Sequence, residues 1–328
     1  MTIIATLLRG GDTGRVAGFV LSLDEAARRE EGAALLPLVR REEGNWWWHQ
    51  HATALAVAAV GLLSTARKVT QILARSTVRL DEGRIEPVLA VARARGITWL
   101  PELAYAMAEK QETASEALQW GFVADLLRAE GLAPPLGDRF VAGWVDTVGW
   151  PRERRGREIP LADRLRHDPF LHPLVPRLFE IDGLGTAMTH LPDALAQLSA
   201  EGVVDRSVLL DGTLGRLLRG DRAAALRAFT TLHDCLAPSP AEIAARRADY
   251  LHLLTDAPSA VAALAQRALR RLEPAALDPA DLAAASQVVL ARPDKALVKG
   301  QLIWLAKVAP ARPQLFTEAL AVAAGHPA

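Results

Sequence analysis

Apolar residues recur every three to four positions through the last third of the chain, which is the spacing of one face of an α-helix. Upstream, Ser239-Pro240-Ala241-Glu242 has the pattern of a capping box, in which serine and glutamate satisfy free amides at a helix start. We therefore expect one helix from Pro240 through Leu254. A second helix is expected over 260–272, with Ser259 as its N-cap.

Two further helices are expected at a regular distance. Asp278-Pro279 repeats the start signal of Ser239-Pro240, and Asp294 can cap a helix over 295–307. The inward face of that helix would carry Val298, Leu302 and Leu305. The first helices of the two pairs begin 39 residues apart and the second helices 35 apart, which is close to the length of a HEAT repeat. The spacing predicts an all-α fold, a right-handed α-solenoid of stacked helical hairpins (a HEAT-like or ARM-like superhelix).

The same pattern of helical periodicity and helix-capping residues extends towards the N-terminus. Helices are expected over 14–23, 24–42, 47–63, 65–76, 83–95, 101–110, 114–130, 135–148, 169–180, 192–201, 205–218 and 222–236. An irregular stretch rich in Pro and Arg, 149–167, would be an exposed loop between a helical-repeat half at 1–148 and HEAT-like repeats at 168–328. We expect the two halves to form one continuous solenoid.

Composition and charge argue against a nucleic-acid binder, a disulfide-bonded protein and a membrane-spanning protein. Half of the 328 residues are hydrophobic, and 38 basic residues balance 38 acidic ones. That balance lacks the basic excess common in nucleic-acid binders. The single cysteine, Cys235, cannot form an internal disulfide, and the longest apolar run, 52–63, is shorter than the ~20 residues that span a bilayer. We expect a cytoplasmic protein without a membrane partner.

Several segments resemble a bacterial family of HEAT-like helical-repeat proteins of unknown function. The residues that carry the resemblance are 167–170, 174–180 with Arg177 and Glu180, 209–212, 216–221, 248–250, 264–266, 293–295, Gln301 and Trp304. The resemblance covers half to two-thirds of the chain and is weakest before Leu126. It implies the fold class and an intracellular location, and it brings no activity to this chain.

The most unusual motif is the aromatic run Trp46-Trp47-Trp48, followed by His49 and His51. Such a run can form a stacking surface for a base, a sugar or a partner peptide, or it can pack inward and cover a groove between helices. Two histidines at i and i+2 do not face each other on a helix, so the spacing disfavours a shared zinc. We predict no metal and no cofactor.

A second candidate site is the arginine group Arg216, Arg219 and Arg222, with His233 one helix later. Arginine forks can clamp a phosphate or a carboxylate. In the structural alternative, Arg219 caps the end of its own helix and Asp221 caps the next one. Arg177, Glu180 and Trp304 complete the predicted binding residues. Glu180 could also join Asp168 and Asp182 as an acid pair, although capping explains the two aspartates.

These features favour a binding or scaffold protein that engages a protein or peptide partner on a concave surface. One alternative is a nucleic-acid-binding HEAT-like protein, similar to the HEAT-like DNA glycosylases. Another is an enzyme or a binder of a small anionic ligand between helices. Because the chain has no Gly-x-Ser-x-Gly, P-loop or His-Glu-x-x-His motif, no catalytic residue is assigned and an enzyme is the less favoured interpretation.

Overall fold

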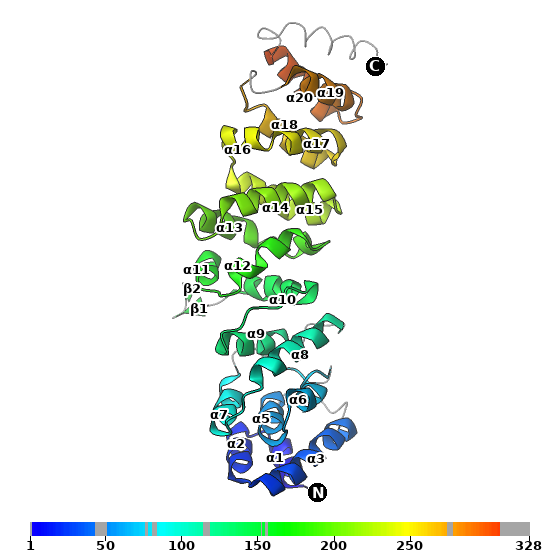
Figure 1. The fold of residues 1–328 in the computed structure, drawn as a ribbon. Helices are drawn as coiled ribbons and strands as arrows, with labels where there is room; N and C mark the ends of the chain where they lie inside the picture. The colour runs from blue at the N-terminus through cyan, green and yellow to red at the C-terminus, as the bar shows by residue number, and fades with distance from the viewer. Residues whose placement is uncertain are drawn as a thin grey trace. The chain divides into compact units, whose positions relative to one another are not determined.

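The computed structural model describes residues 2–42, 51–75, 78–80, 84–113, 119–151, 153–154, 157–273 and 278–308. This part of the chain contains nineteen α-helices, two short 3₁₀ turns and one antiparallel ladder of two-residue strands. The ladder pairs β1 (Glu153–Arg154) with β2 (Arg157–Glu158). The all-α prediction is confirmed (Figure 1).

The chain divides into two compact units. Unit 1 comprises Met1–Trp150 and Asp168–Arg177, and unit 2 comprises Pro151–His167 and Leu178–Ala328. The helices of unit 1 are α1 (Ile3–Gly10), α2 (Thr13–Ser22), α3 (Glu25–Arg41), α5 (Ala52–Leu62), α6 (Ala66–Leu73), α7 (Glu86–Ala94), α8 (Leu100–Thr113), α9 (Trp120–Ala129), α10 (Asp138–Gly149) and α12 (Leu171–Leu174).

Helix α5 forms the centre of unit 1. Every residue of this helix except Thr53 is buried, because α2, α3, α6 and α7 all pack against it. A helix that is apolar on all sides is stable only when it is enclosed in this way. The apolar run at 52–63 is therefore an enclosed core helix. Nowhere in the described residues is a helix both long and apolar enough to cross a membrane.

Unit 2 is built from pairs of helices. After the ladder come α11 (Leu161–Arg166), the 3₁₀ turn η2 (Leu184–Thr186), α13 (Leu191–Ala200), α14 (Arg206–Arg219), α15 (Ala223–Leu236), α16 (Pro240–Ala245), α17 (Arg247–Asp256), α18 (Ser259–Leu269), α19 (Pro279–Leu290) and α20 (Lys295–Val308). The ladder and α11 give regular structure to much of the stretch expected to be irregular.

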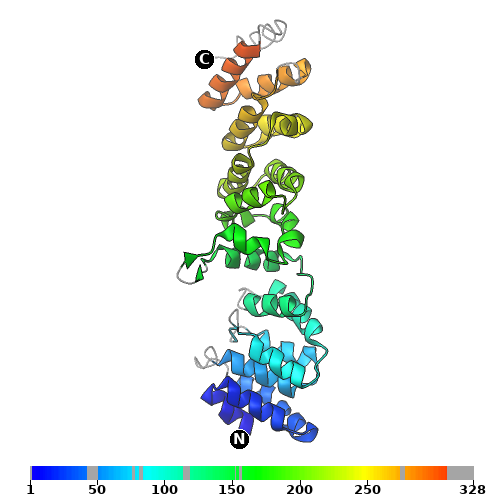
Figure 2. The same ribbon diagram turned by 90° about the vertical axis from the view of Figure 1, so that its left-hand side faces the viewer.

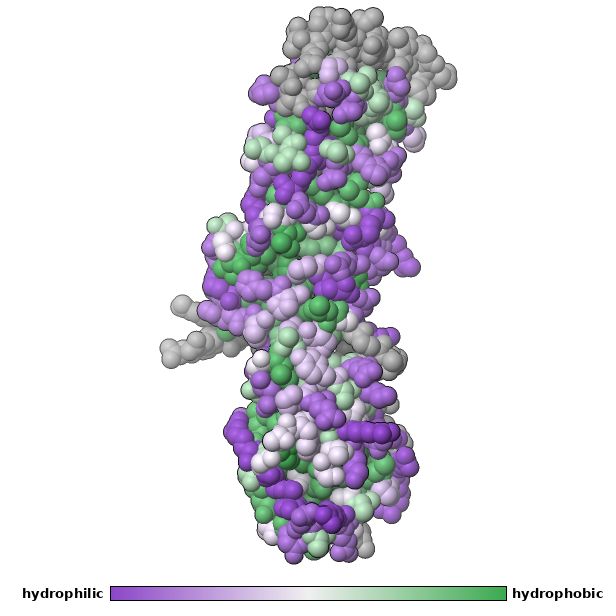
Figure 3. Space-filling model, in the orientation of Figure 1, coloured by the Kyte–Doolittle hydropathy of each residue, from purple (hydrophilic) through white to green (hydrophobic). Residues whose placement is uncertain are grey.

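Each pair in unit 2 buries its apolar faces against its neighbours. Helices α14 and α15, α17 and α18, and α19 and α20 pack within their pairs (Figures 1 and 2). Between pairs, α17 contacts both α14 and α19, and α18 contacts α20. Outward-facing residues stay largely polar, and on the face drawn in Figure 3 hydrophobic residues are interspersed with hydrophilic ones.

Two predicted helices are broken where the chain was expected to continue. The helix expected from Pro240 through Leu254 divides at Arg246, whose φ of −113° and ψ of 21° leave the helical region. Arg246 compensates by donating from Nη1 to the Glu242 carbonyl at 3.3 Å. The helix expected over 169–180 is reduced to α12 and the 3₁₀ turn η1 (Pro176–Phe179), because proline lacks the amide that a continuing α-helix needs.

Two helix starts differ in their caps. The capping box of Ser239 and Glu242 forms as predicted, and Asp278 accepts from the amides of Ala280 and Asp281. Ser259 does not cap α18, because Pro258 takes the N-cap position. The Ser259 hydroxyl instead donates to Asp294 Oδ2 at 2.6 Å.

The buried face of α20 is rotated from the predicted one. Leu302 is 43% exposed, whereas Gln301 and Trp304 are buried beside Leu305. The Gln301 amide explains the rotation, since Gln266 Nε2 donates to its Oε1 and its own Nε2 donates to Ser286 Oγ, both at 2.8 Å. A satisfied polar network can occupy a core, and a search for apolar periodicity does not detect it.

Two glycines on α14 provide a matched test of this packing. A methyl group at Gly212 would overlap the ring of Phe179, which is only 3% exposed, whereas one at Gly215 meets only the end of the Arg219 side chain at 3.9 Å. We expect Gly212→Ala to lower the free energy of unfolding by about 1–3 kcal/mol. Gly215→Ala should raise it by about 0.5–1 kcal/mol, because alanine loses less entropy in a helix. Urea unfolding followed by circular dichroism measures both, and equal effects would contradict the packing.

Candidate functional site

Arg216, the first residue of the predicted arginine clamp, is buried inside unit 2. It is 1% exposed, and its Nη1 lies 2.6 Å from Asp182 Oδ1. Its Nη2 lies 2.9 Å from Asp221 Oδ2 and donates to the Gly220 carbonyl at the end of α14. The chain's own carboxylates therefore already occupy this guanidinium.

The remaining members of the group have different partners. Arg219 is exposed and donates to the Phe179 carbonyl, so Arg216 and not Arg219 caps the end of α14. Asp221 does not cap α15, whose N-cap position is Arg222. Its carboxylate accepts from the Gly183 amide, which lowers the pKa of Asp221. This placement gives the group an internal role and does not favour an open anion clamp.

The other predicted binding residues lie apart from one another. Arg177 bridges to Asp138 at 2.8 Å and to the Leu136 carbonyl, both within unit 1. Glu180 is exposed, and Trp304 is 2% exposed on the buried face of α20. Trp46, Trp47 and Trp48 lie outside the described residues.

His233 does line a pocket. The pocket lies in unit 2 between the end of α15 and α18, with a volume of about 270 Å³. Asp234, Arg267 and Arg271 contribute its charged groups, and the lining is completed by Ala237, Pro238, Leu264 and Ala268. We call this cavity the α15–α18 pocket. When His233 is neutral, the two arginines and the aspartate give the pocket a net charge of +1.

The His233 ring is fixed on one side only. Its Nε2 lies 2.8 Å from the Tyr250 hydroxyl of α17. The two rings pack edge to face, with their centroids 5.7 Å apart. Burial lowers the pKa of His233 and raises the pKa of Tyr250 to about 12, so a neutral imidazole faces a protonated phenol at pH 7. Among the described residues, the buried Nδ1 has no hydrogen-bond partner.

Asp234 stands between the histidine and the arginines. Its Oδ1 lies 3.7 Å from His233 Nδ1 and 3.5 Å from Arg267 Nη2. Both distances exceed those of strong charge-assisted hydrogen bonds. Arg267 is 60% exposed, so its guanidinium can accept an anion from solution without unfolding the chain.

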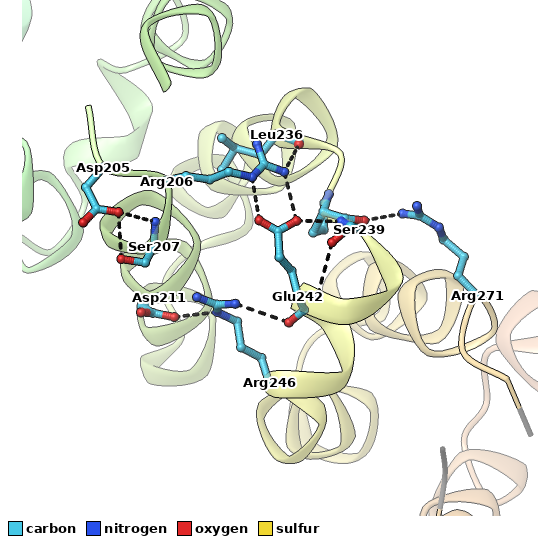
Figure 4. Close-up of polar contacts among 10 residues, drawn as sticks. Asp205, Arg206, Ser207, Asp211, Leu236, Ser239, Glu242, Arg246 and Arg271 are labelled. Atoms are coloured by element: carbon cyan, nitrogen blue, oxygen red, sulfur yellow. Dashed lines mark hydrogen bonds and ion pairs between the residues drawn. The ribbon is translucent and has the colours of Figure 1, made fainter. Parts of the chain in front are cut away.

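The turn between α15 and α16, which contributes Ala237 and Pro238 to the pocket lining, is held from both sides (Figure 4). Arg271 donates to the Pro238 carbonyl at 2.8 Å. Arg206 of α14 contacts both carboxylate oxygens of Glu242, at 2.6 and 3.2 Å, and donates to the Leu236 carbonyl. The arginine lowers the pKa of Glu242 to about 2. The turn between α15 and α16 is thus a preformed feature of unit 2.

Sequence reasoning identified His233 but missed Arg267 and Arg271. The available signal was their spacing of four residues, which places two cations on one side of a helix end. The sequence does not reveal that these two arginines lie against the end of α15, which is more than thirty residues earlier in the chain. Among the described residues, no group of three or more His, Cys, Asp or Glu side chains is placed to hold a metal ion.

No protein-family model, no curated protein and no solved structure matches this chain. The resemblance to HEAT-like repeat proteins is therefore an expectation from the sequence. The function rests on the geometry of the described sites.

Ala237 adopts a conformation that alanine rarely occupies. Its φ of 44° and ψ of 62° are left-handed, at the position that ends α15. Glycine is favoured there because a Cβ atom costs about 1–2 kcal/mol in this region. We expect Ala237→Gly to raise the free energy of unfolding by about 1 kcal/mol in urea titrations. Ala263→Gly, in the middle of α18, makes the same chemical change and should lower it by a similar amount.

Acid should destabilise the fold through His233. Because burial holds the folded pKa below the ordinary value of 6.5, the unfolded chain gains a proton first as the pH falls below ~6.5. The free energy of unfolding therefore decreases from that pH downward until the folded imidazole also titrates. We expect His233→Gln to lose less stability than the wild type between pH 7.5 and 5.5 (about two units centred on ~6.5), measured by urea unfolding. The exposed His172→Gln should keep the wild-type loss.

Proposed function

We propose that this chain is a helical-repeat binding protein that holds a protein or peptide partner. The contacts of α17 with both α14 and α19, and of α18 with α20, support a HEAT-like right-handed α-solenoid for unit 2. Stacked hairpins of this kind present repeated helix ends to a partner. The pocket between α15 and α18 lies at one of these repeated junctions.

The observation that carries the proposal is the α15–α18 pocket with its two arginines. A carboxylate of the partner would accept hydrogen bonds from Arg267 and Arg271, and it would neutralise the net charge of +1. The carboxylate can come from an acidic side chain or from a free C-terminus of the partner. Leu264 and Ala268 provide apolar surface for the atoms that carry it.

A nucleic acid fits this pocket less well. Phosphate backbones are bound through many cations along a groove, and affinity grows with the number of phosphates neutralised. Here the pocket holds two arginines beside an aspartate, in a chain whose formal charge is zero. A peptide carboxylate needs only one such site.

The test is a peptide selection followed by variants. We expect a random peptide library, selected on the full chain, to yield peptides that share a carboxylate. Binding of one selected peptide is then measured by fluorescence polarisation. Arg267→Gln should weaken it about tenfold, the value of one charge-assisted hydrogen bond. Arg270→Gln is the matched control, because Arg270 is the next arginine along and does not line the pocket.

Peptide chemistry separates the two sources of the carboxylate. Amidating the C-terminus abolishes binding if the terminal carboxylate is held, and Glu-to-Gln or Asp-to-Asn changes abolish it if a side chain is held. Selected peptides without any shared carboxylate, or equal binding to Arg267→Gln, would overturn the proposal. Binding of an oligonucleotide that weakens steeply with salt and depends on Arg267 would replace it with the nucleic-acid interpretation.

A further inference from the structure

Unit 1 contains a larger hollow that is separate from the pocket of the proposed function. It lies between α3 and α6, over the end of α5, and has a volume of about 490 Å³. We call it the α3–α6 groove. Its size falls within the range of about 300–1,000 Å³ typical of sites for small organic molecules.

Apart from Arg29, the α3 side of the groove is apolar and shaped by small residues. Gly32, Ala33 and Leu36 follow helical spacing and so share one face of α3. Gly32 lets this helix come close to α5, since a Cβ atom there would lie 3.0 Å from the Leu62 carbonyl oxygen. Leu62, Leu63 and Ile72 add further apolar lining.

The α6 side of the groove is polar and carries a positive charge. Ser64, Lys68 and Gln71 are spaced at i, i+4 and i+7, which aligns them along one side of the helix start. Lys68 Nζ lies 3.5 Å from Ser64 Oγ and has no acidic partner within the described ranges. Arg29, the other cation that lines the groove, is already paired with Glu25 one turn earlier. Lys68 is therefore the cation available to an anionic ligand.

The combination defines the chemistry of the ligand. An apolar wall faces a wall with one available ammonium group, one hydroxyl and one amide. Such a site suits a molecule with an aliphatic body and a single negatively charged head group. Ten residues line the groove, fewer than the roughly 20–30 residues a side of a stable protein interface. A small amphiphile matches this area better than a protein surface does.

We propose that the α3–α6 groove binds a fatty acid, with the carboxylate on Lys68 and the alkyl chain between Leu36 and Leu62. Lys68 and the Ser64 and Gln71 side chains supply donors for the two carboxylate oxygens. Burial of the chain supplies most of the affinity, at about 25 cal/mol per Å² of apolar surface. Lys68 selects the charged head group over a neutral one.

The experiment titrates the full chain with decanoate by isothermal calorimetry, below the concentration at which decanoate forms micelles. We expect saturable binding at one site per chain. Lys68→Gln should weaken decanoate about fivefold, as expected for an exposed ion pair, and leave decanol unchanged. Arg67→Gln is the matched control, because it removes an exposed cation from the same helix outside the groove.

A second pair of variants tests the apolar wall. Ala33 is exposed in the groove, so Ala33→Trp fills it without disturbing the core and should abolish binding of both decanoate and decanol. Ala26→Trp adds the same ring to an exposed position of α3 outside the groove and should keep both. Absence of saturable decanoate binding, or wild-type affinity in Lys68→Gln or Ala33→Trp, would overturn the proposal. None of these outcomes alters the peptide test, which depends on residues of unit 2.

Discussion

The packing of apolar helix faces against neighbouring helices is the constraint on which both units depend. In unit 1, α5 is apolar on all sides and is stable because α1, α2, α3, α6 and α7 pack against it. Among the described helices of unit 2 none is enclosed in this way, and α17 is instead held between α14, α18 and α19. Each pair of helices there buries the apolar face that the preceding pair leaves uncovered. A change in the contact between two pairs therefore affects more than the helix in which it occurs.

The same packing accounts for two buried polar residues, of which Arg216 was a predicted binding residue. Arg216 is drawn into the core, where Asp182 and Asp221 hold its charge. Gln301 is buried on the inner face of α20, where Gln266 and Ser286 satisfy its amide. Buried polar groups persist only with such partners, since an unpaired one costs about 1–3 kcal/mol. His233 in the α15–α18 pocket is only partly paired, because its Nε2 lies 2.8 Å from the Tyr250 hydroxyl while its Nδ1, like Arg216 Nε, has no hydrogen-bond partner among the described residues.

Local signals predicted the all-α class and several helix starts, and long-range contacts explain what they missed. The capping box of Ser239 and Glu242 and the cap of Asp278 depend on neighbouring residues, so the sequence was sufficient for both. The break at Arg246 was not predictable, because Arg246 pairs with Asp211 at 2.5 Å, from another helix. The same holds for the candidate site. His233 was identified, but the arginines that join it come from a helix that only the tertiary fold brings near.

Asp234 determines how the proposed site discriminates among anions. A carboxylate that reaches Arg267 competes with Asp234, whose Oδ1 is 3.5 Å from the guanidinium and 3.7 Å from His233 Nδ1. Because neither contact is short, little interaction is lost when the aspartate turns away from Arg267. A singly charged carboxylate matches the net charge of +1 that the two arginines and the aspartate give the pocket. A dianionic phosphate would exceed it by one charge, so the aspartate brings the pocket to the charge of the group that the proposed function requires.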